Sequence, residues 1–373
     1  MYKVESYING QSSSESNNSA KIYNPSYGTE IGEVLYATND VANKAVESAY
    51  QASKAWAKTG LSFRAELILK FRQGVINRSK EIIDICISEA GKTRPDAEAE
   101  LDRAVQALTH AAGVQHFYPS NYSQNVAGGI DIADLRFPIG VIAGVGPFNF
   151  PILIPILHSA MALVTGNTYI AKPSEKVPSI SRLYADIWNE AGLPDGCYNV
   201  VHGEKEIVEL LVKHEKVDGL AFIGSTVAAK SLKKLGVEHN TKVQALGGGK
   251  NHMIVLPDAD LDMSADAAVS ASFGAAGQRC MAVSVVVAVG DIADELISKI
   301  QSRMPDLVMG VTDDEKTQLG PVISQANKDK IYSFIDSAEP DGASLVVDGR
   351  HRSNSLEGCF VGPTLIDNVK PGM

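Results

Sequence analysis

Residues 139–146 read "IGVIAGVG", and this apolar run is the first of five short ones between residues 139 and 248. The other four are "NTYIAK" at 167–172, "CYNVVHG" at 197–203, "VDGLAFIGS" at 217–225 and "KVQALGG" at 242–248. Amphipathic segments such as "SISRLYADIWNEAG" and "KEIVELLVKHE" separate these runs. Strands that alternate with helices in this way predict an α/β fold with a doubly wound parallel sheet.

The segments on either side of this core complete the predicted organisation. Residues 39–57, "NDVANKAVESAYQASKAWA", predict a helix with Asn39 or Asp40 as its N-cap, and more helices are expected up to about residue 117. Residues 118–138 break the helical pattern with glycine, proline and short alternating runs, which favours a hairpin arm. A second α/β run begins at residue 248, so we expect one domain from 1–117 with 139–247 and another from 248–373.

Composition disfavours nucleic acid and membrane partners. The chain has 34 basic and 44 acidic residues and a net charge of −10, so it offers no cationic surface for nucleic acid or anionic lipid. The N-terminus lacks the apolar stretch of a signal peptide, and no run of about 18 apolar residues could span a bilayer. We therefore expect a cytoplasmic protein.

Two glycine-rich stretches fail as phosphate-binding motifs. In "QALGGGKNHMIV" at 244–255, a P-loop would need glycine in place of Gln244 and serine or threonine in place of Asn251. Near Gly144 and Gly146, the dinucleotide pattern G-x-G-x-x-G is broken because Asn149 stands at the third glycine. A bound nucleotide must therefore use other parts of the sheet.

Ligands of open α/β sheets bind outside the carboxyl ends of the strands, where two stretches are suitable. "YIAKPSE" places Lys172 and Glu175 after one strand, where they could hydrogen-bond ribose hydroxyls. "FIGST" places Gly224 and Ser225 at the start of a helix, where free amides favour a pyrophosphate. The alternative for these stretches is an ordinary loop turn and a helix cap.

Cysteine and histidine spacing indicates neither a disulfide framework nor a zinc site or other metal site. In "FGAAGQRCMAVSV", Arg279 could favour a thiolate at Cys280, although a lone cysteine before an apolar strand is more often part of the core. Asn149 follows a buried strand, where its amide could donate to an oxyanion or form a turn. The remaining cysteines, which we interpret as structural, are Cys86, Cys197 and Cys359.

Five stretches taken in order resemble the aldehyde dehydrogenase superfamily across nearly the whole chain: "PIGVIAGVGPFNFP", "GNTYIAKPSEKVP", "LAFIGS", "GGKNH" and "FGAAGQRCMA". The "KNH" tripeptide, the cysteine motif and an arginine at 103 resemble the CoA-acylating methylmalonate semialdehyde dehydrogenase branch. The resemblance implies that Cys280 is the catalytic nucleophile and that Asn149, with the backbone N–H of Cys280, stabilises the oxyanion. Hydride then passes to NAD⁺ and leaves an acyl thioester on Cys280.

The resemblance also implies a set of cofactor contacts and an NAD-binding role for the first domain. Glu175 would repel a 2′-phosphate, which favours NAD over NADP. Lys176 and Gly247 fall at contact positions where relatives of the branch often have other residues. The complete cofactor-binding set is Gly146, Phe148, Lys172, Glu175, Lys176, Gly224, Ser225 and Gly247.

Leu246 stands where hydrolytic members of the family have a glutamate that activates water, so the thioester is expected to transfer to CoA. By resemblance, Arg103 and Arg279 bind the carboxylate of a 3-oxo acid, such as malonate or methylmalonate semialdehyde, which is decarboxylated. The family is homo-oligomeric through the hairpin arm and continues past residue 373, so this chain is expected to be truncated in its catalytic domain. The alternatives are a hydrolytic semialdehyde dehydrogenase and a non-catalytic remnant that binds dinucleotide or a partner subunit.

Overall fold

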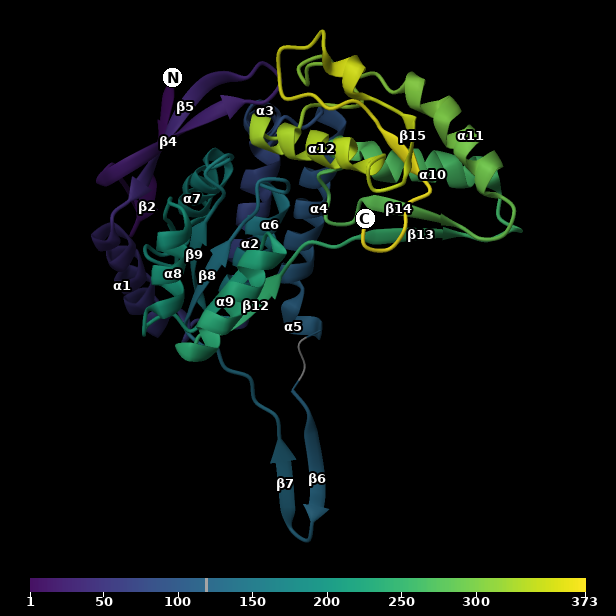
Figure 1. Ribbon diagram of the computed structural model, residues 1–373. Helices are drawn as coiled ribbons and strands as arrows, with labels where there is room; N and C mark the ends of the chain where they lie inside the picture. The colour runs from purple at the N-terminus through teal and green to yellow at the C-terminus, as the bar shows by residue number, and fades with distance from the viewer. Residues whose placement is uncertain (118–119) are drawn as a thin grey trace. The chain divides into compact units, whose positions relative to one another are not determined.

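The computed structural model describes residues 1–117 and 120–373, and its helices and strands are labelled in Figure 1. The chain forms two compact units. The first comprises Met1–Ile22, Gly32–Ile82 and Ala99–Gly247, and the second comprises Tyr23–Ile31, Ile83–Glu98 and Gly248–Met373. The sequence predicts all of 1–117 in one domain, whereas two segments of that range pack within the second unit.

The first long helix, α1 (Asn39–Trp56), begins after Thr38. The Thr38 hydroxyl accepts a hydrogen bond from the Val41 amide at 3.1 Å, which makes Thr38 the N-cap. The predicted cap at Asn39 or Asp40 is therefore wrong by one or two positions. Apolar residues that recur every three or four positions along α1 are fully buried, namely Val41, Ala42, Ala45, Val46 and Ala49.

Four more helices follow as predicted, namely α2 (Leu61–Asn77), α3 (Ser79–Ala90), α4 (Arg94–Ala112) and α5 (Val114–Phe117). On α4, Leu101 and Leu108 are buried, whereas Arg103 is exposed. Arg103 therefore lies off the apolar stripe of this helix.

The central sheet of the first unit has seven strands in the order β12-β11-β8-β9-β10-β2-β3. The five predicted strands are all present and parallel: β8 (Val141–Val145), β9 (Thr168–Lys172), β10 (Tyr198–Val200), β11 (Gly219–Ile223) and β12 (Lys242–Leu246). Two antiparallel edge strands, β2 (Ser6–Ile8) and β3 (Gln11–Ser13), are added from the polar N-terminal segment. The strand order reverses between β8 and β11, which is the topological switch point of a doubly wound sheet.

Helices cover both faces of this sheet, as Figure 1 shows. On one face, α1 packs with α8 (Lys205–Lys213) and α9 (Thr226–Glu238) over buried residues of β8 and β11. On the other face, α2 packs with α6 (Leu153–Val164) and α7 (Ser179–Ala191), and the Phe71 ring stacks on Trp188 at 3.7 Å between centroids. Because both faces are covered, the inner parallel strands are largely buried, as β9 illustrates with all five residues buried.

Residues 120–138 contain the predicted hairpin, formed by the antiparallel strands β6 (Tyr122–Ala127) and β7 (Ile130–Ala133). Residues 118 and 119 of the predicted arm lie outside the described residues. Every residue of both strands is exposed. A separate three-stranded sheet near the N-terminus has the order β1 (Tyr2–Val4), β5 (Thr29–Ala37) and β4 (Ser16–Asn24).

The second α/β run, which the sequence predicts from residue 248, contains the strands β13 (Asn251–Val255) and β14 (Val283–Ala288), and the structure pairs them in parallel. Helices α10 (Leu261–Phe273) and α11 (Ala293–Arg303) pack together, and Asp260 caps α10 by accepting hydrogen bonds from two amides. The C-terminal part of the second unit contains α12 (Gln325–Ala338), the antiparallel pair β15 (Ser344–Val347) and β16 (Leu365–Asp367), and short 3₁₀ turns. The apolar core of this unit comprises Val255, Ala265, Ala268, Val269, Leu296, Ile300 and Met304.

Across residues 1–117 and 120–373, no helix combines the length and the apolar character that a membrane span requires. The same residues contain no group of three or more histidine, cysteine, aspartate or glutamate side chains arranged to hold a metal ion.

Candidate active site

The candidate cofactor residues of the first unit follow the carboxyl ends of its parallel strands. Gly146 comes directly after β8, and its amide donates to the carbonyl of Lys172 at the end of β9, at 3.1 Å. Gly224 comes directly after β11, and its amide donates to the carbonyl of Leu246 at the end of β12, also at 3.1 Å. Because β8 and β11 flank the switch point, these backbone contacts align the strand ends where a nucleotide is expected.

Lys172 and Glu175 form a pair suited to a ribose. The Lys172 ammonium group lies 3.9 Å from the Glu175 carboxylate, and the lysine side chain is almost fully buried. Burial lowers the pKa of Lys172, while the negative charges of Glu175 and Glu204 act in the opposite direction. A buried cation beside a carboxylate offers a donor and an acceptor to neighbouring hydroxyl groups.

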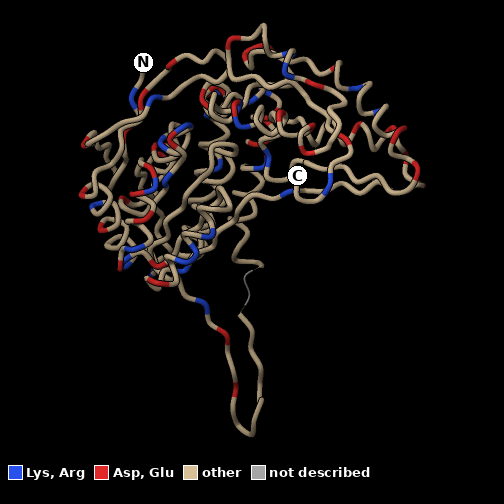
Figure 2. The backbone as a smooth tube through the Cα atoms, in the orientation of Figure 1, with Lys and Arg blue, Asp and Glu red and all other residues tan. Residues whose placement is uncertain are grey.

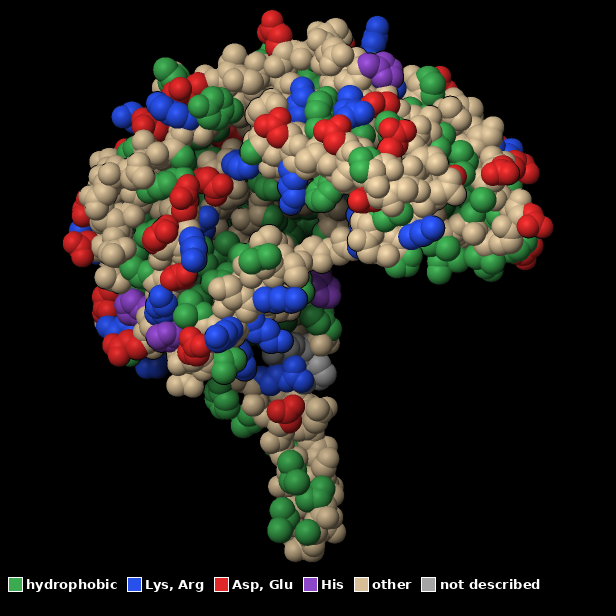
Figure 3. All heavy atoms as spheres, viewed as in Figure 1, with side chains coloured by type: hydrophobic (Ala, Val, Ile, Leu, Met, Phe, Trp, Pro, Cys, Tyr) green, Lys and Arg blue, Asp and Glu red, His purple; other side chains and the backbone are tan. Residues whose placement is uncertain are grey.

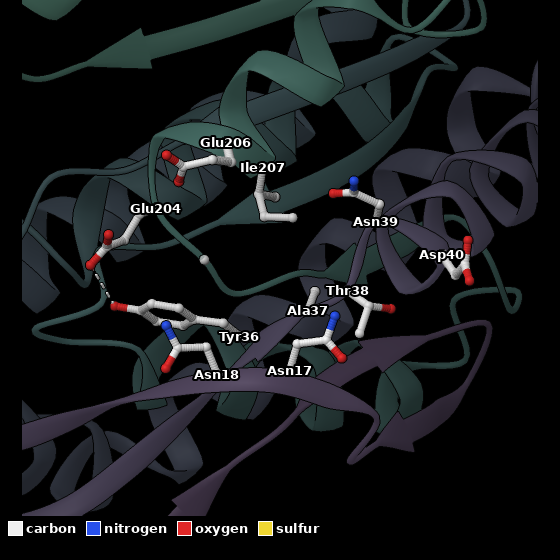
Figure 4. Close-up of a pocket in the computed structure, with 11 residues that line it drawn as sticks. Asn17, Asn18, Tyr36, Ala37, Thr38, Asn39, Asp40, Glu204, Glu206 and Ile207 are labelled. Atoms are coloured by element: carbon white, nitrogen blue, oxygen red, sulfur yellow. Dashed lines mark hydrogen bonds between the residues drawn. The ribbon is translucent and has the colours of Figure 1, made fainter.

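Glu204 is a member of this cluster that the sequence analysis missed. It lies at the N-terminal end of α8 and accepts a hydrogen bond from the Tyr36 hydroxyl at 2.9 Å, drawn in Figure 4. A cavity of about 440 Å³ adjoins this pair, and its carboxylates make it unsuitable for a phosphate group. The residues that line it are Asn17, Asn18, Tyr36, Ala37, Thr38, Asn39, Asp40, Gly203, Glu204, Glu206 and Ile207.

The N-terminus of α9 is better suited to a pyrophosphate. Ser225 is its N-cap, and the serine hydroxyl accepts a hydrogen bond from the Ala228 amide at 3.3 Å. The positive end of the dipole of this 13-residue helix favours an anion here. Gly247 passes close to this turn, since a Cβ at 247 would lie 3.0 Å from Thr226 Cα. The positive end of the helix and the close backbone approach fit a dinucleotide.

Asn149 lies in the connection between β8 and α6, and a buried carboxylate fixes that connection. One oxygen of Glu100, whose side chain is buried, accepts from the amides of Ile152 and Leu153 at 2.8 and 2.9 Å. The Phe148 ring lies beneath the Lys176 ammonium group, with 5.7 Å between nitrogen and ring centroid. Glu100 was missed because only its contact with a segment fifty residues away reveals its role.

Arg103 is exposed on α4 and donates to the side-chain oxygen of Gln106 at 3.2 Å. In the part of the chain that the structure describes, it forms no ion pair. The guanidinium is therefore available to an external carboxylate.

Cys280 lies in a turn before β14 and is exposed, whereas Cys86, Cys197 and Cys359 are buried. The sequence pattern alone favours a core position for Cys280, and the structure contradicts that interpretation. The side-chain amide of Asn251, the first residue of β13, donates to the carbonyl of Cys280 at 2.9 Å. Asn251 is thus a further residue of the site that the sequence analysis did not identify.

The backbone before Cys280 follows an uncommon path. Ala275, Ala276 and Gly277 have φ angles of 51°, 53° and 73°, so three successive residues are left-handed. For alanine this conformation costs roughly 1–2 kcal/mol per residue. The next residue, Gln278, stabilises the turn because its side-chain oxygen accepts from the Ile323 amide at 3.0 Å.

Arg279 is half-buried and forms an ion pair with Asp96, in which Nη2 donates to Oδ1. Its guanidinium lies against the backbone of Gly274, where a Cβ would approach the guanidinium nitrogens to within 2.6 to 2.8 Å. Glycine at 274 is therefore needed for this arginine conformation. Asp96 was not identified from the sequence.

Comparison with known proteins identifies the family of this chain. Residues 12–373 match the profile of the aldehyde dehydrogenase family. The chain belongs to this family. Among curated aldehyde dehydrogenases, it is 38% identical over 369 residues to a malonate-semialdehyde dehydrogenase of Bacillus pumilus, covering 98% of this chain and 76% of that protein. It is 40% identical to the malonate-semialdehyde dehydrogenase of Pseudomonas aeruginosa, covering 98% and 74%.

Solved aldehyde dehydrogenase structures agree with this assignment. The methylmalonate-semialdehyde dehydrogenase of Oceanimonas doudoroffii matches with a TM-score of 0.97 at 39% identity, covering 100% of this chain and 77% of that one. A protein of Sinorhizobium meliloti assigned to the same activity and complexed with NAD matches with a TM-score of 0.96 at 38% identity and the same coverage. The predicted fold, the predicted family and the NAD-dependent enzyme class are confirmed.

The buried histidine His202 should make the free energy of unfolding of this aldehyde dehydrogenase depend on pH. His202 follows β10 and is 1% exposed; its Nε2 contacts the Glu5 carbonyl at 3.2 Å, and among the described residues its Nδ1 has no partner. Burial lowers the pKa of His202 to about 3, so its stabilising contribution is complete above the ordinary histidine pKa and is lost as pH falls toward the folded value.

Between pH 7 and 5, His202 should remove about 2 kcal/mol from the free energy of unfolding. Urea titrations at the two pH values measure this loss. His202→Gln, which cannot be protonated, should show a loss smaller by about that amount. Equal losses in the two proteins would contradict the assignment.

Proposed function

We propose that this chain oxidises malonate or methylmalonate semialdehyde with NAD⁺ and transfers the acyl group to CoA, with loss of CO₂ from the substrate carboxylate. The principal support is the exposed Cys280 next to Arg279, whose guanidinium is only partly occupied by Asp96. The names of the relatives, and their identities of 38% and 40%, support the same substrate class. We also propose that the protein is located in the cytoplasm.

The proposed reaction begins at Cys280. Its thiolate adds to the aldehyde carbon, and the side-chain amide of Asn149 donates to the oxygen that becomes negative. Bound NAD⁺ supplies the hydride acceptor. Loss of hydride from the carbon converts the thiohemiacetal into a thioester on Cys280, and Glu175 favours the cofactor without a 2′-phosphate.

The carboxylate of the substrate is assigned to Arg103 and Arg279. A guanidinium can bind a carboxylate through two parallel N–H groups, and both side chains have donors without a carboxylate partner. When the carboxylate leaves as CO₂, the electron pair of the broken C–C bond passes toward the neighbouring thioester carbonyl and forms an enolate. The carbon that held the carboxylate then takes up a proton from solvent. The product on Cys280 is then an acetyl or propanoyl thioester.

Transfer to CoA, and not to water, is assigned because Leu246 ends β12 without a basic group. An uncharged, aliphatic side chain cannot accept a proton from water, whereas a thiol ionises near neutral pH and needs less assistance. The experiment follows NADH from malonate semialdehyde and NAD⁺ with and without CoA. Sustained NADH formation should require CoA and produce acetyl-CoA, and equal rates without CoA with free acid as the product would overturn the proposal.

We also propose that the hairpin arm of residues 120–138 binds a second copy of the chain. Its charged residues are only Asp131, Asp134 and Arg136, as Figure 2 illustrates, and hydrophobic side chains lie along its surface in Figure 3. An isolated two-stranded hairpin is marginally stable in water, so a covering surface is expected. The exposed apolar residues are Tyr122, Val126, Ile130, Ile132, Leu135 and Phe137.

Ile132→Asp should convert an oligomer into monomers, because it places a charge in the apolar surface of the arm. Ile132 is 56% exposed in the single chain, so folding of the subunit should be unaffected. Light scattering measures the mass of each variant. Ser123 of β6 pairs with Ile132 of β7, so Ser123→Asp tests whether a charge on the same face of the hairpin also gives monomers. An unchanged mass in both variants would contradict the assignment.

A further inference from the structure

Asp96 lies in the first turn of α4, where both of its carboxylate oxygens have partners. The Thr93 hydroxyl donates to Oδ2 at 3.1 Å, and the Asp96 amide donates back to the Thr93 hydroxyl at 3.4 Å. Oδ1 accepts from Nη2 of Arg279. The aspartate side chain is 15% exposed, so its charge is only weakly screened by solvent. The carboxylate is therefore fixed by local contacts and points at the residue that precedes Cys280.

The guanidinium of Arg279 is occupied on one edge only. Its Nη2 binds Asp96 and one side packs on Gly274, while Nε and Nη1 form no hydrogen bond within residues 1–117 and 120–373. The arginine side chain is 34% exposed. A guanidinium has five N–H donors in a planar fork, so an incoming carboxylate can bind the remaining edge without breaking the contact with Asp96.

We propose that Asp96 is a positioning residue that sets the strength with which Arg279 binds the substrate carboxylate. This inference rests on the proposed function, in which Arg279 binds that carboxylate. Asp96 holds the guanidinium in place and offsets part of its charge, so the substrate shares the cation with an internal carboxylate. Selectivity for a carboxylated aldehyde is then weaker than an unpaired arginine would give, and release of an anionic ligand is easier.

Alkylation of Cys280 tests this charge balance without NAD, CoA or turnover. Iodoacetate and iodoacetamide attack the same thiolate, but only iodoacetate has a carboxylate. The ratio of their second-order rate constants, measured by mass spectrometry of the Cys280 peptide, cancels changes in thiol ionisation or general access. The three other cysteines are buried, so Cys280 is the preferred target in the folded protein.

Asp96→Asn should raise the iodoacetate-to-iodoacetamide ratio by about 3- to 10-fold, because it removes a negative charge and leaves Arg279 in place. Asp96→Ser removes the same charge and should give a similar rise, which protects the test against misfolding of one variant. Asp96→Glu should leave the ratio near that of the wild type. Arg279→Gln should lower it by a comparable factor.

Asp262→Asn is the matched control, since Asp262 also pairs with an arginine of the second unit, Arg303, but its side chain is exposed on helix α10. Its ratio should equal that of the wild type. An Asp96→Asn ratio that is unchanged or lowered would overturn the proposal. An unchanged ratio for Arg279→Gln would overturn it together with the carboxylate role of Arg279, whereas absent NADH formation with the expected ratios would overturn the proposed function alone.

Discussion

Cys280→Ser is expected to reduce NADH formation by at least about 10³-fold, because a serine hydroxyl at this position has no base to ionise it. Cysteine is partly ionised near neutral pH and is intrinsically a stronger nucleophile. In the structure Cys280 is exposed in a turn whose carbonyl is held by Asn251, so the substitution alters one atom at an accessible site.

Spectrophotometric assays of NADH formation by the two proteins measure the loss. Cys359→Ala is a suitable control because Cys359 is buried in the same unit, and that variant should keep most of its activity. Comparable activity of Cys280→Ser and the wild type would exclude Cys280 as the nucleophile.

Leu246→Glu is expected to make the enzyme turn over without CoA, with release of the free acid rising by about 10²-fold or more. A carboxylate at this position would accept a proton from the attacking water. Leu246 is 52% exposed at the end of β12, so a glutamate side chain can be placed there without being buried. The backbone bond between the Leu246 carbonyl and the Gly224 amide does not depend on the side chain.

Leu246→Gln is the matched control, since it has the shape of glutamate without the basic oxygen. The free acid released per NADH formed, with CoA omitted, distinguishes the variants. If both variants hydrolyse the thioester at the same rate, loss of leucine and not gain of a base would explain the change, and the assignment of Leu246 would be wrong.

The parts of the fold that depend on local patterns were predictable from the sequence. The parallel strands were found because each is a short apolar run between amphipathic helices, and the hairpin because glycines interrupt an alternating segment. The α1 cap was misplaced because Thr38, Asn39 and Asp40 are all good capping residues, and only the hydrogen bond to Val41 distinguishes them.

The parts of the site that depend on distant contacts were not predictable in this way. Glu100, Asp96 and Glu204 are ordinary helix residues in the sequence, and their roles arise from partners between 52 and 183 positions away. The exposure of Cys280 is likewise set by a left-handed turn of two alanines and a glycine, which no residue preference would suggest. The Thr93 and Asp96 pair was the one available signal, because its spacing is that of a capping box.

The left-handed turn at Ala275 and Ala276 has a consequence for how quickly the enzyme can respond to its substrate. Glycine would adopt this backbone without penalty but would also leave the turn many other conformations. With alanine, the stored energy of roughly 2–4 kcal/mol is balanced by folding of the surrounding unit, and the loop has fewer alternatives to visit once formed. The loop that carries the Cys280 thiol is therefore ordered before an aldehyde binds. Its conformational entropy is lost once, when the protein folds, and not in every catalytic cycle.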